Sequence, residues 1–273
     1  MASRAITIVS LATPVVILLG AALVVPLLAL LEESVNDGKG ALTLANYAAV
    51  VNSLSYRRAL LNTVLIAVAS TVLALVLCFP IAVYLERSAS RWRNALAVAL
   101  TIPLSLPGIV IGFFVILLFG LTGFVPQLFL LVTGERQLNF AYTFGGMLLG
   151  YLYFQIPRVV LVLRGAVSAL SQDVIDVSRT LGATPLRVYL DVLVPMLAPA
   201  VLSAASVGLA TALGAFGTAA TLSRGFRVLP LEIASLFTEN FDVQRAASLS
   251  IVLAGLTVVV LLGIGQLAER ARR

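Results

Sequence analysis

Six long stretches without a single charged residue constrain the fold of this chain more than any other feature. They cover residues 5–31, 59–85, 94–134, 137–157, 192–223 and 246–268. A helix that crosses the hydrocarbon core of a bilayer needs about 20 predominantly apolar residues. Every stretch is long enough, and only 11% of the 273 residues are charged, whereas soluble domains average about 25%. We therefore predict an all-α, polytopic membrane protein with one domain, residues 1–273.

The stretch at 94–134 is long, yet it is too short for two spans joined by a turn. Its segment FGLTGFVPQ, residues 119–127, contains two glycines and a proline and is typical of a break in a helix. We therefore expect one span here, followed by a short non-spanning piece at 124–132. The six predicted spans are residues 5–31, 59–85, 96–118, 140–163, 196–220 and 246–268, and the loop between the fourth and fifth spans covers residues 164–195.

The distribution of charges between the loops predicts the orientation. If both termini and the loops after the second and fourth spans face the cytoplasm, that side carries ten basic and five acidic residues, and the other side carries seven of each. Cytoplasmic loops of membrane proteins are enriched in Lys and Arg, so we expect both termini in the cytoplasm. The first stretch is longer than the apolar core of a signal peptide, roughly 7–15 residues, so we expect an uncleaved first span.

Composition also narrows the function classes. The chain has no histidine, which is the commonest metal ligand and general base, and its one cysteine, Cys78, excludes an intrachain disulfide. The net charge of +6 is dispersed rather than clustered, which argues against a nucleic-acid partner. No GxxxxGK[ST] phosphate-binding loop occurs. We therefore expect neither enzymatic activity nor a bound cofactor in this chain.

A polar segment, DVSRTLGATPLRVYLDVLVP at residues 176–195, interrupts the apolar sequence between the fourth and fifth spans. It predicts a short helix that stops at Gly182 and a second helix that begins at Pro185 with Thr184 as its N-cap, because Gly suits a helix C-terminus and Pro a first turn. Val174, Val177 and Leu181 fall on one face of the first helix, so we expect that face to anchor the segment. A solvated amphipathic loop is the simpler alternative.

The spacing of this segment resembles the cytoplasmic EAA loop of permease subunits of binding-protein-dependent ABC importers, E-A-A, three residues, G, nine residues, I-x-L-P. Asp176, Val177 and Ser178 occupy the E-A-A positions, Gly182 the glycine, and Val192 to Pro195 the last four positions. The surrounding sequence TLGATPLRVY is also similar to the family's usual sequence at this place. Together with the six spans, it extends the resemblance over nearly the whole chain. Leu-Pro-Gly at residues 106–108 resembles permeases for polyamines, sulfate, molybdate, phosphonates and ferric iron.

The resemblance implies that the loop is a coupling helix, which docks on a cytoplasmic ATPase and transmits its movement to the membrane helices. It assigns this role to Asp173, Asp176, Val177, Ser178, Arg179, Gly182, Ala183, Pro185, Arg187 and Pro195, the last of which would begin the fifth span. It further implies partner ABC ATPase subunits that use ATP and Mg, a second and different permease chain, an external solute-binding protein and a place in the bacterial inner membrane.

A few residues within the spans are candidates for the translocation pathway. Pro103, Pro107, Gly108 and Gly112 lie close together and predict either an unwound gate or a packing kink. Asn62 and Gln155 either face a water-filled pathway or satisfy hydrogen bonds between helices. Arg158 lies near the inner end of the fourth span, and we expect its side chain to reach the membrane interface.

The resemblance implies that this chain forms half of a two-permease pore that takes up a small charged solute. The spans contain no Asp or Glu that would complement a polycation, which favours an oxyanion such as sulfate, molybdate or a phosphonate, with a polyamine or ferric iron left open. An ion-gradient-driven secondary transporter is the alternative, although such proteins commonly place ionisable residues at mid-membrane. A non-transporting scaffold that binds a cytosolic protein is a third reading.

Overall fold

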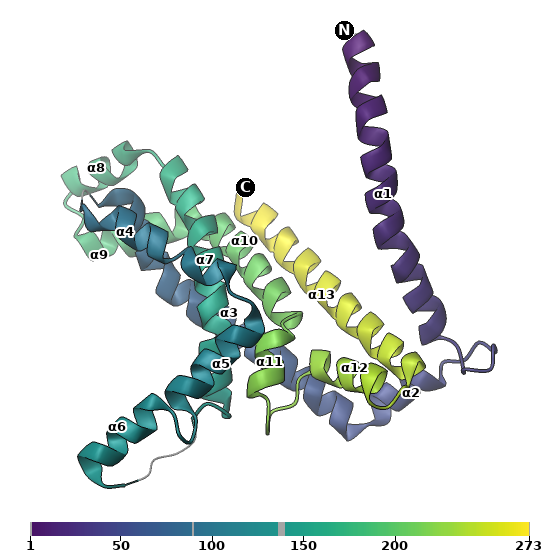
Figure 1. Ribbon diagram of the computed structural model, residues 1–273. Helices are drawn as coiled ribbons and strands as arrows, with labels where there is room; N and C mark the ends of the chain where they lie inside the picture. The colour runs from purple at the N-terminus through teal and green to yellow at the C-terminus, as the bar shows by residue number, and fades with distance from the viewer. Residues whose placement is uncertain (1, 89, 136–139, 273) are drawn as a thin grey trace. The chain divides into compact units, whose positions relative to one another are not determined.

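The computed structural model describes residues 2–88, 90–135 and 140–272, with side chains described from residue 13 to residue 271 (Figure 1). The regular secondary structure of these residues is helical, apart from one isolated antiparallel bridge between Asn36 and Leu42. The first elements are α1 (Ala2–Ser34), α2 (Ala45–Asn52), α3 (Leu54–Arg87), α4 (Trp92–Ala99), the 3-10 helix η1 (Ile102–Ser105), α5 (Gly108–Phe119), α6 (Phe124–Thr133) and α7 (Phe144–Ala169). They are followed by α8 (Gln172–Thr180), α9 (Pro185–Arg187), the π-helix η2 (Val188–Leu193), α10 (Val194–Leu213), α11 (Gly217–Leu222), α12 (Leu229–Thr238) and α13 (Val243–Arg272).

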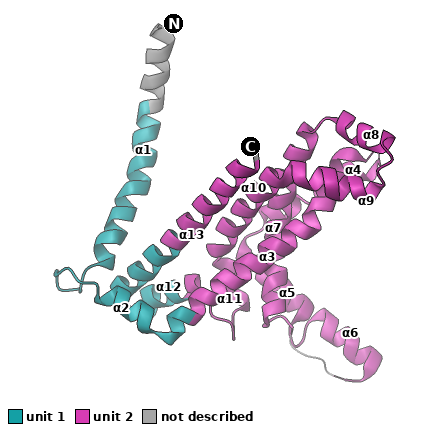
Figure 2. Ribbon diagram, turned by 180° about the vertical axis from the view of Figure 1, so that it is seen from behind, with its two compact units in different colours: residues 1–57, 232–254 teal, residues 58–231, 255–273 magenta. Residues whose placement is uncertain are grey.

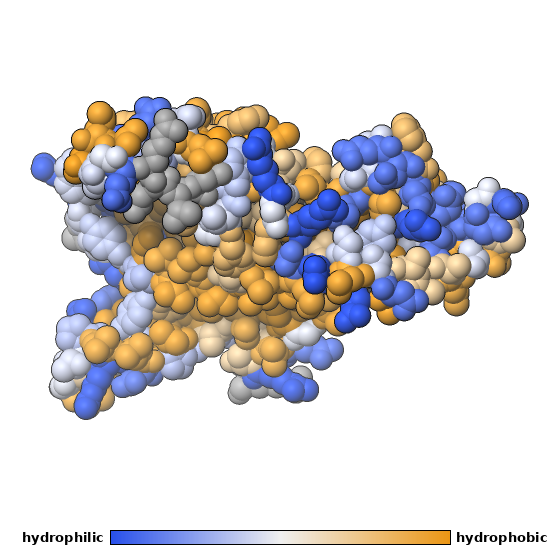
Figure 3. All heavy atoms as spheres, turned by 90° about the horizontal axis from the view of Figure 1, so that it is seen from below, coloured by the Kyte–Doolittle hydropathy of each residue, from blue (hydrophilic) through white to orange (hydrophobic). Residues whose placement is uncertain are grey.

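Six helical stretches in the described residues are long and apolar enough to cross a membrane. They are Thr13–Ser34, Leu54–Arg87, Gly108–Thr133, Phe144–Ala169, Pro185–Leu213 and Val243–Ala271. Hydrophobic side chains cover broad areas of the surface (Figure 3), as expected for helices that contact lipid instead of water. The predicted all-α class and the number of six spans are confirmed.

The third span differs from the expected 96–118. The chain leaves the helix after Ala99, forms η1, and begins a new helix at Gly108. Pro103 and Pro107 account for the break, because each lacks an N–H and cannot continue the hydrogen bonding of an α-helix. The piece at 124–132, expected to be non-spanning, is α6 and belongs to the third membrane-length stretch.

The fourth and fifth spans also differ from the expected 140–163 and 196–220. Helix α7 continues to Ala169, and the next membrane-length helix begins at Pro185 instead of Pro195. The helix accommodates Pro195, which has no N–H, by widening into η2 just before it, and the Val194 N–H bonds the Tyr189 carbonyl five residues earlier. The irregular part of the predicted loop at 164–195 is thereby reduced to residues 170–171 and 181–184.

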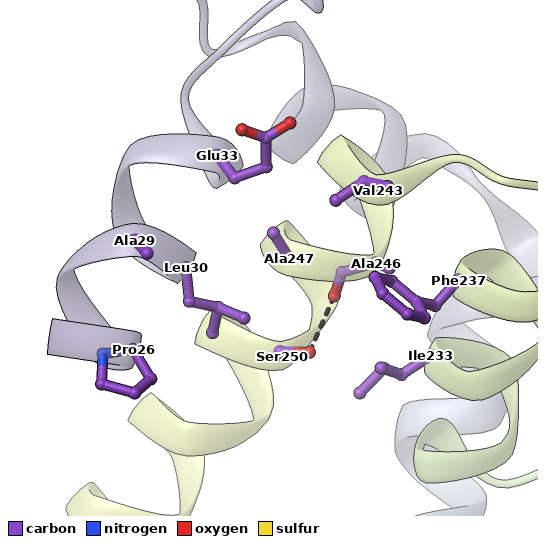
Figure 4. Close-up of a pocket in the computed structure, with 10 residues that line it drawn as sticks. All are labelled: Pro26, Ala29, Leu30, Glu33, Ile233, Phe237, Val243, Ala246, Ala247 and Ser250. Carbon is purple, nitrogen blue, oxygen red and sulfur yellow. Dashed lines mark hydrogen bonds between the residues drawn. The ribbon is translucent and has the colours of Figure 1, made fainter. Parts of the chain in front are cut away.

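The chain forms two compact units, one of Met1–Arg57 with Glu232–Ala254 and one of Arg58–Leu231 with Gly255–Arg273 (Figure 2). In the first unit, Ser34 bonds the Tyr47 hydroxyl at 2.7 Å, and Ser248 donates to the Ser34 carbonyl at 3.0 Å. A cavity of about 540 Å³ in this unit is lined mainly by apolar side chains of α1, α12 and α13, with Glu33 near one end (Figure 4). Such a lining suits lipid or packing better than a polar solute.

Two apolar clusters of the second unit lie beside the residues predicted to be functional. The first joins α3, α7, η2 and α10 through buried side chains that include Leu85, Leu163, Val167, Val188 and Leu197. The second joins α3, α5, α7, α10 and α11 through buried side chains that include Ile66, Ile111, Met147, Tyr151 and Leu213. The first cluster reaches the predicted coupling segment, and the second contains Ile111 of α5, which is next to the predicted pathway residue Gly112. These two places are the candidate sites.

Candidate coupling corner and translocation pathway

The predicted coupling segment begins with a capped helix. Ser171 is the N-cap of α8, and its hydroxyl accepts a hydrogen bond from the Asp173 N–H at 3.2 Å. The same hydroxyl donates to the Asp173 carboxylate at 2.8 Å. Asp173 lies in the first turn and Arg179 in the last, so both charges complement the helix dipole. The N-cap and the two charges at the helix ends explain why these nine residues form a helix.

Gly182 ends α8 in a Schellman motif. Its N–H donates to the Arg179 carbonyl at 2.9 Å, and the Ala183 N–H donates to the Ser178 carbonyl at 3.1 Å. This pattern requires a left-handed residue at the turn, and Gly182 has a φ of 85°. A Cβ there would meet nothing within 4 Å, so the backbone conformation alone accounts for glycine at this position.

The second arm of the corner begins where the sequence predicts. The Thr184 hydroxyl accepts from the Arg187 N–H at 3.4 Å, and Pro185 occupies the first turn. From Pro185 the chain runs through α9 and η2 into α10 without a break. Residues 171–193 therefore form a helix, a glycine corner and a second helix, which we call the α8–α9 corner.

The buried face of α8 is not the predicted one. Ile175 has an exposed fraction of only 5% and belongs to the first apolar cluster, whereas Val177 is 57% and Leu181 82% exposed. The expectation that Val174, Val177 and Leu181 form the anchor is wrong, because the pattern ignored the isoleucine between them. The other predicted coupling residues divide into exposed ones, Asp173, Asp176, Arg179, Gly182, Pro185, Arg187 and Pro195, and the half-buried Ser178 and Ala183.

Two contacts that sequence analysis missed hold this corner to α3, and a third joins α3 to α7. Arg87, at the end of α3, donates to Gln172 of α8 at 2.8 Å, and its neighbour Glu86 pairs with Arg164 of α7 at 2.6 Å. On the second arm, the rings of Tyr189 and Phe79 pack edge to face at 5.2 Å. The available signal was the pair of charges at the end of the second span, from which the sequence predicts only a boundary and an orientation.

The predicted pathway glycines lie where α5 crosses α11. A Cβ at Gly112 would overlap the Thr221 hydroxyl, and one at Gly217 would lie 2.9 Å from the Ile109 nitrogen. The Thr218 hydroxyl donates to the Gly108 carbonyl at 3.1 Å. Gly108 and Gly112 thus let two backbones approach closely. Pro103 and Pro107 lie just before this crossing, where the α-helix is unwound, Pro103 in the 3-10 helix η1 and Pro107 in the extended N-cap of α5.

The polar candidates of the other spans, Asn62 and Gln155, each donate a hydrogen bond to another segment, although the buried Gln155 Oε1 accepts none from the described residues. Gln155 is fully buried and donates to the Ser70 hydroxyl at 2.7 Å, and Asn62 donates to the Arg227 carbonyl at 2.9 Å. Both placements favour hydrogen bonding between segments over a free position on a pathway. Arg158 donates to the Phe154 carbonyl of its own helix at 2.6 Å and lies over the Phe154 ring.

A buried tyrosine that sequence analysis missed supports the break between α10 and α11. Tyr151 is 1% exposed, and its hydroxyl donates at 3.2 Å to the carbonyl of Ala215, which lies in that break. Carbonyls at helix ends lack partners within the helix. The Tyr151 hydroxyl therefore stabilises the break after α10. The predicted fifth span, residues 196–220, runs through this break as if it were continuous helix.

Comparison with known proteins decides the family. The model of the binding-protein-dependent transport system inner membrane component matches residues 78–273, which is most of the chain. The chain belongs to this family. It is a permease subunit of an ABC importer, a multi-pass inner membrane protein and a non-catalytic subunit, and the ATPase is a separate partner. Family membership decides against the ion-gradient-driven secondary transporter and the non-transporting scaffold.

Its relatives include permeases for different solutes. The molybdenum transport system permease protein ModB of Mycobacterium tuberculosis is 33% identical over 221 residues, 80% of this chain and 81% of the relative. The sulfate permease CysT of Salmonella typhimurium is 26% identical over 66% of this chain and 65% of its own. The spermidine/putrescine permease PotB of Escherichia coli is 24% identical over 80% and 81%.

Solved structures of ABC transporters share the fold. A chain of the bacterial alginate ABC transporter, in complex with an alginate-bound periplasmic protein, matches with a TM-score of 0.85 at 15% identity, over 98% of this chain and 96% of that chain. A chain of the MetNI methionine ABC transporter in an inward-facing conformation matches with a TM-score of 0.61 at 17% identity, over 85% and 100%. At these identities the likeness concerns the fold alone.

Proposed function

We propose that this permease forms half of a pore for a small oxyanion, with molybdate as the first candidate. The observation that carries the proposal is the 33% identity to ModB over four fifths of the chain. The sulfate and polyamine permeases match less closely, at 26% and 24%. Two of these three permeases are named for a solute that occurs in water as a tetrahedral dianion.

The charges of the spans support an anionic solute. The uncharged stretches contain no Asp or Glu that could complement a polyamine or a bare metal cation. A carboxylate in the pathway would repel a dianion, and a charge at membrane depth is costly unless it is paired or used. The chain is therefore suited to an oxyanion that an external solute-binding protein delivers.

The coupling role belongs to the α8–α9 corner in this proposal. Its outer side combines exposed apolar side chains, among them Val177, Leu181 and Leu186, with the exposed charges of Asp176 and Arg187. An exposed apolar patch with a charged rim is typical of a protein interface. The occupant is an ATPase subunit that uses ATP and Mg, so this corner and both termini face the cytoplasm. A second permease chain completes the pore.

A transport assay tests the solute. The chain is reconstituted in liposomes with its ATPase, its second permease and the loaded binding protein, and ATP-dependent uptake of radiolabelled molybdate, sulfate and spermidine is measured. We expect molybdate to be accumulated and excess unlabelled sulfate to compete only weakly. Accumulation of spermidine without either anion would contradict the oxyanion proposal and leave the family assignment intact.

A matched pair of variants tests the corner. Leu181→Asp places a carboxylate in the exposed patch, and Leu42→Asp makes the same change in a loop of the first unit, at a residue 84% exposed against 82% for Leu181. We expect Leu181→Asp to abolish the solute-stimulated ATP hydrolysis or to release the ATPase from the complex. Leu42→Asp should leave both unchanged. Equal behaviour of the two variants would overturn the coupling role.

A further inference from the structure

Arg87 connects three consecutive pieces of the chain. Its Nη2 donates to the carbonyls of Val167 and Leu170, at 2.8 and 2.7 Å, and its Nη1 donates to the Gln172 side chain at 2.8 Å. The first carbonyl belongs to the last turn of α7, the second to its C-cap, and Gln172 begins α8. A cation suits these carbonyls because the last carbonyls of a helix lack intrahelical partners and carry partial negative charge.

A second tie lies beside the first. The Glu86 carboxylate pairs with the Arg164 Nε at 2.6 Å, between the end of α3 and the last turns of α7. Two adjacent residues of α3 therefore bond α7 at two positions, Glu86 at Arg164 and Arg87 at the Val167 carbonyl. The ends of these helices cannot separate or slide without breaking several charge-assisted hydrogen bonds, which are stronger than neutral ones.

The apolar side of α8 reaches the same helices. Ile175 belongs to one buried cluster with Leu85 of α3 and Leu163 of α7. On the second arm of the corner, Tyr189 packs edge to face on Phe79, again a residue of α3. The α8–α9 corner is thus held to α3 by a polar contact at one arm and an aromatic contact at the other.

Arg158 provides a contrast to Arg87. Both arginines donate to backbone carbonyls of α7. The acceptor of Arg158, the Phe154 carbonyl, belongs to the same helix as Arg158 itself, so this bond joins no two elements. Arg87 instead bonds two elements other than its own.

We infer that Arg87 and Gln172 form a joint that passes movement of α8 directly to α3, the second membrane span. The inference rests on the proposed coupling function of the α8–α9 corner. When an ATPase subunit displaces α8, the joint makes α3 follow it as one body with the end of α7. Arg87 is a positioning residue in this mechanism, because it touches neither the solute nor the nucleotide.

Hydrolysis measurements on the reconstituted complex test the joint. We expect Arg87→Gln to assemble and to keep its basal ATP hydrolysis, and to lose at least about fivefold of the stimulation by loaded binding protein, the lower range of couplings between sites. Gln172→Leu should behave similarly, and Gln172→Glu, which retains an acceptor for Arg87, should preserve stimulation. Arg158→Gln is the matched control and should leave stimulation unchanged.

A distance measurement separates a transmitting role from a merely structural one. Spin labels are attached to cysteines placed at Thr180 of α8 and Tyr84 of α3, both exposed, while the buried Cys78 is replaced by alanine. With the joint intact, we expect the distance between the labels to be the same with and without ATP. In Arg87→Gln, ATP should change or broaden it, because α8 then moves without α3.

The outcomes distinguish this inference from the coupling role itself. If Leu181→Asp abolishes stimulation, while Arg87→Gln retains full stimulation and the same label distances as the unmodified chain, the joint is overturned and the coupling role stands. If Leu181→Asp retains stimulation, the coupling role fails, and the joint fails with it. Loss of assembly in Arg87→Gln would assign Arg87 to folding and would also overturn the inference.

Discussion

The α8–α9 corner and the crossing of α5 and α11 both depend on glycine, but for opposite physical reasons. At the corner, Gly182 has a left-handed backbone and empty space around it. At the crossing, Gly112 is part of an ordinary α-helix, and no space exists for even one more carbon atom beside Thr221. One glycine provides a conformation, and the other provides a close approach.

The difference indicates what each region does. A corner with free space around it can present side chains to another protein, whereas a crossing without free space fixes two helices against each other. The predicted gate at residues 103–112 therefore combines a tightly held part, Gly108 and Gly112, with an unwound part, Pro103 and Pro107. If this segment contains a gate, we expect the moving portion to be the unwound one.

The largest stability effect should come from the anchor of the corner. Ile175→Ala removes a side chain that is buried among α3 and α7, and such truncations cost about 2–5 kcal/mol. Val177→Ala, two residues away on the exposed side, should change the free energy of unfolding by less than about 0.5 kcal/mol. Thermal unfolding of both variants in detergent measures this contrast. Similar midpoints would mean that α8 is not anchored through Ile175.

The crossing should respond next. Gly112→Ala adds a Cβ that overlaps Thr221, and overpacking of this kind costs about 1–3 kcal/mol. Gly165→Ala makes the same change in α7, where nothing lies within 4 Å of the new atom, and should gain up to about 1 kcal/mol from helix propensity. Purified yield and unfolding temperature should therefore fall for one variant and not for the other.

The sequence was sufficient where one residue type determines local structure. Gly182, Thr184 and Pro185 predicted the stop and the restart of the helix, because backbone conformation and capping depend on near neighbours. The number of spans also followed from apolar length alone. The span at 196–220 was misplaced for the opposite reason, since a contact from a distant residue, Tyr151 with Ala215, stabilises the break between α10 and α11. The span at 96–118 was misplaced although its break lies at a local signal, the two prolines at 103 and 107.

The contacts of the corner were beyond a reading of periodicity. Val177 and Leu181 fit one helical face, yet the residue that packs against α3 and α7 is Ile175. Only the tertiary structure shows which face of α8 is buried. The role of Arg87 was likewise invisible, because its acceptors lie 80 to 85 positions along the chain. Charge at the end of a span predicts a boundary, but not the bonds that the charge makes.

A smaller effect is expected from the conformation of the corner itself. Gly182→Ala imposes a left-handed backbone on a residue with a Cβ, which costs roughly 1–2 kcal/mol. Gly134→Ala is the matched control, because Gly134 also follows the last turn of a helix with a left-handed backbone, φ of 74°, and empty surroundings. Both variants should lose similar stability, but only Gly182→Ala should reduce solute-stimulated ATP hydrolysis. Equal stimulated hydrolysis in the two variants would mean that the conformation of the corner has no part in coupling.

The smallest effect concerns the cap of the second arm. Thr184→Ala removes the hydroxyl that accepts from the Arg187 N–H, and the bond is long at 3.4 Å, so we expect a loss of about 0.5–1 kcal/mol, the lower part of the range for N-caps. Thr184→Ser keeps the hydroxyl and should restore stability. Because α9 continues through η2 into α10, the remaining helix should hold the arm in place, and stimulated hydrolysis should stay near its normal value in both variants. A strong loss of stimulation in Thr184→Ala that serine restores would instead mean that the corner transmits movement through its second arm.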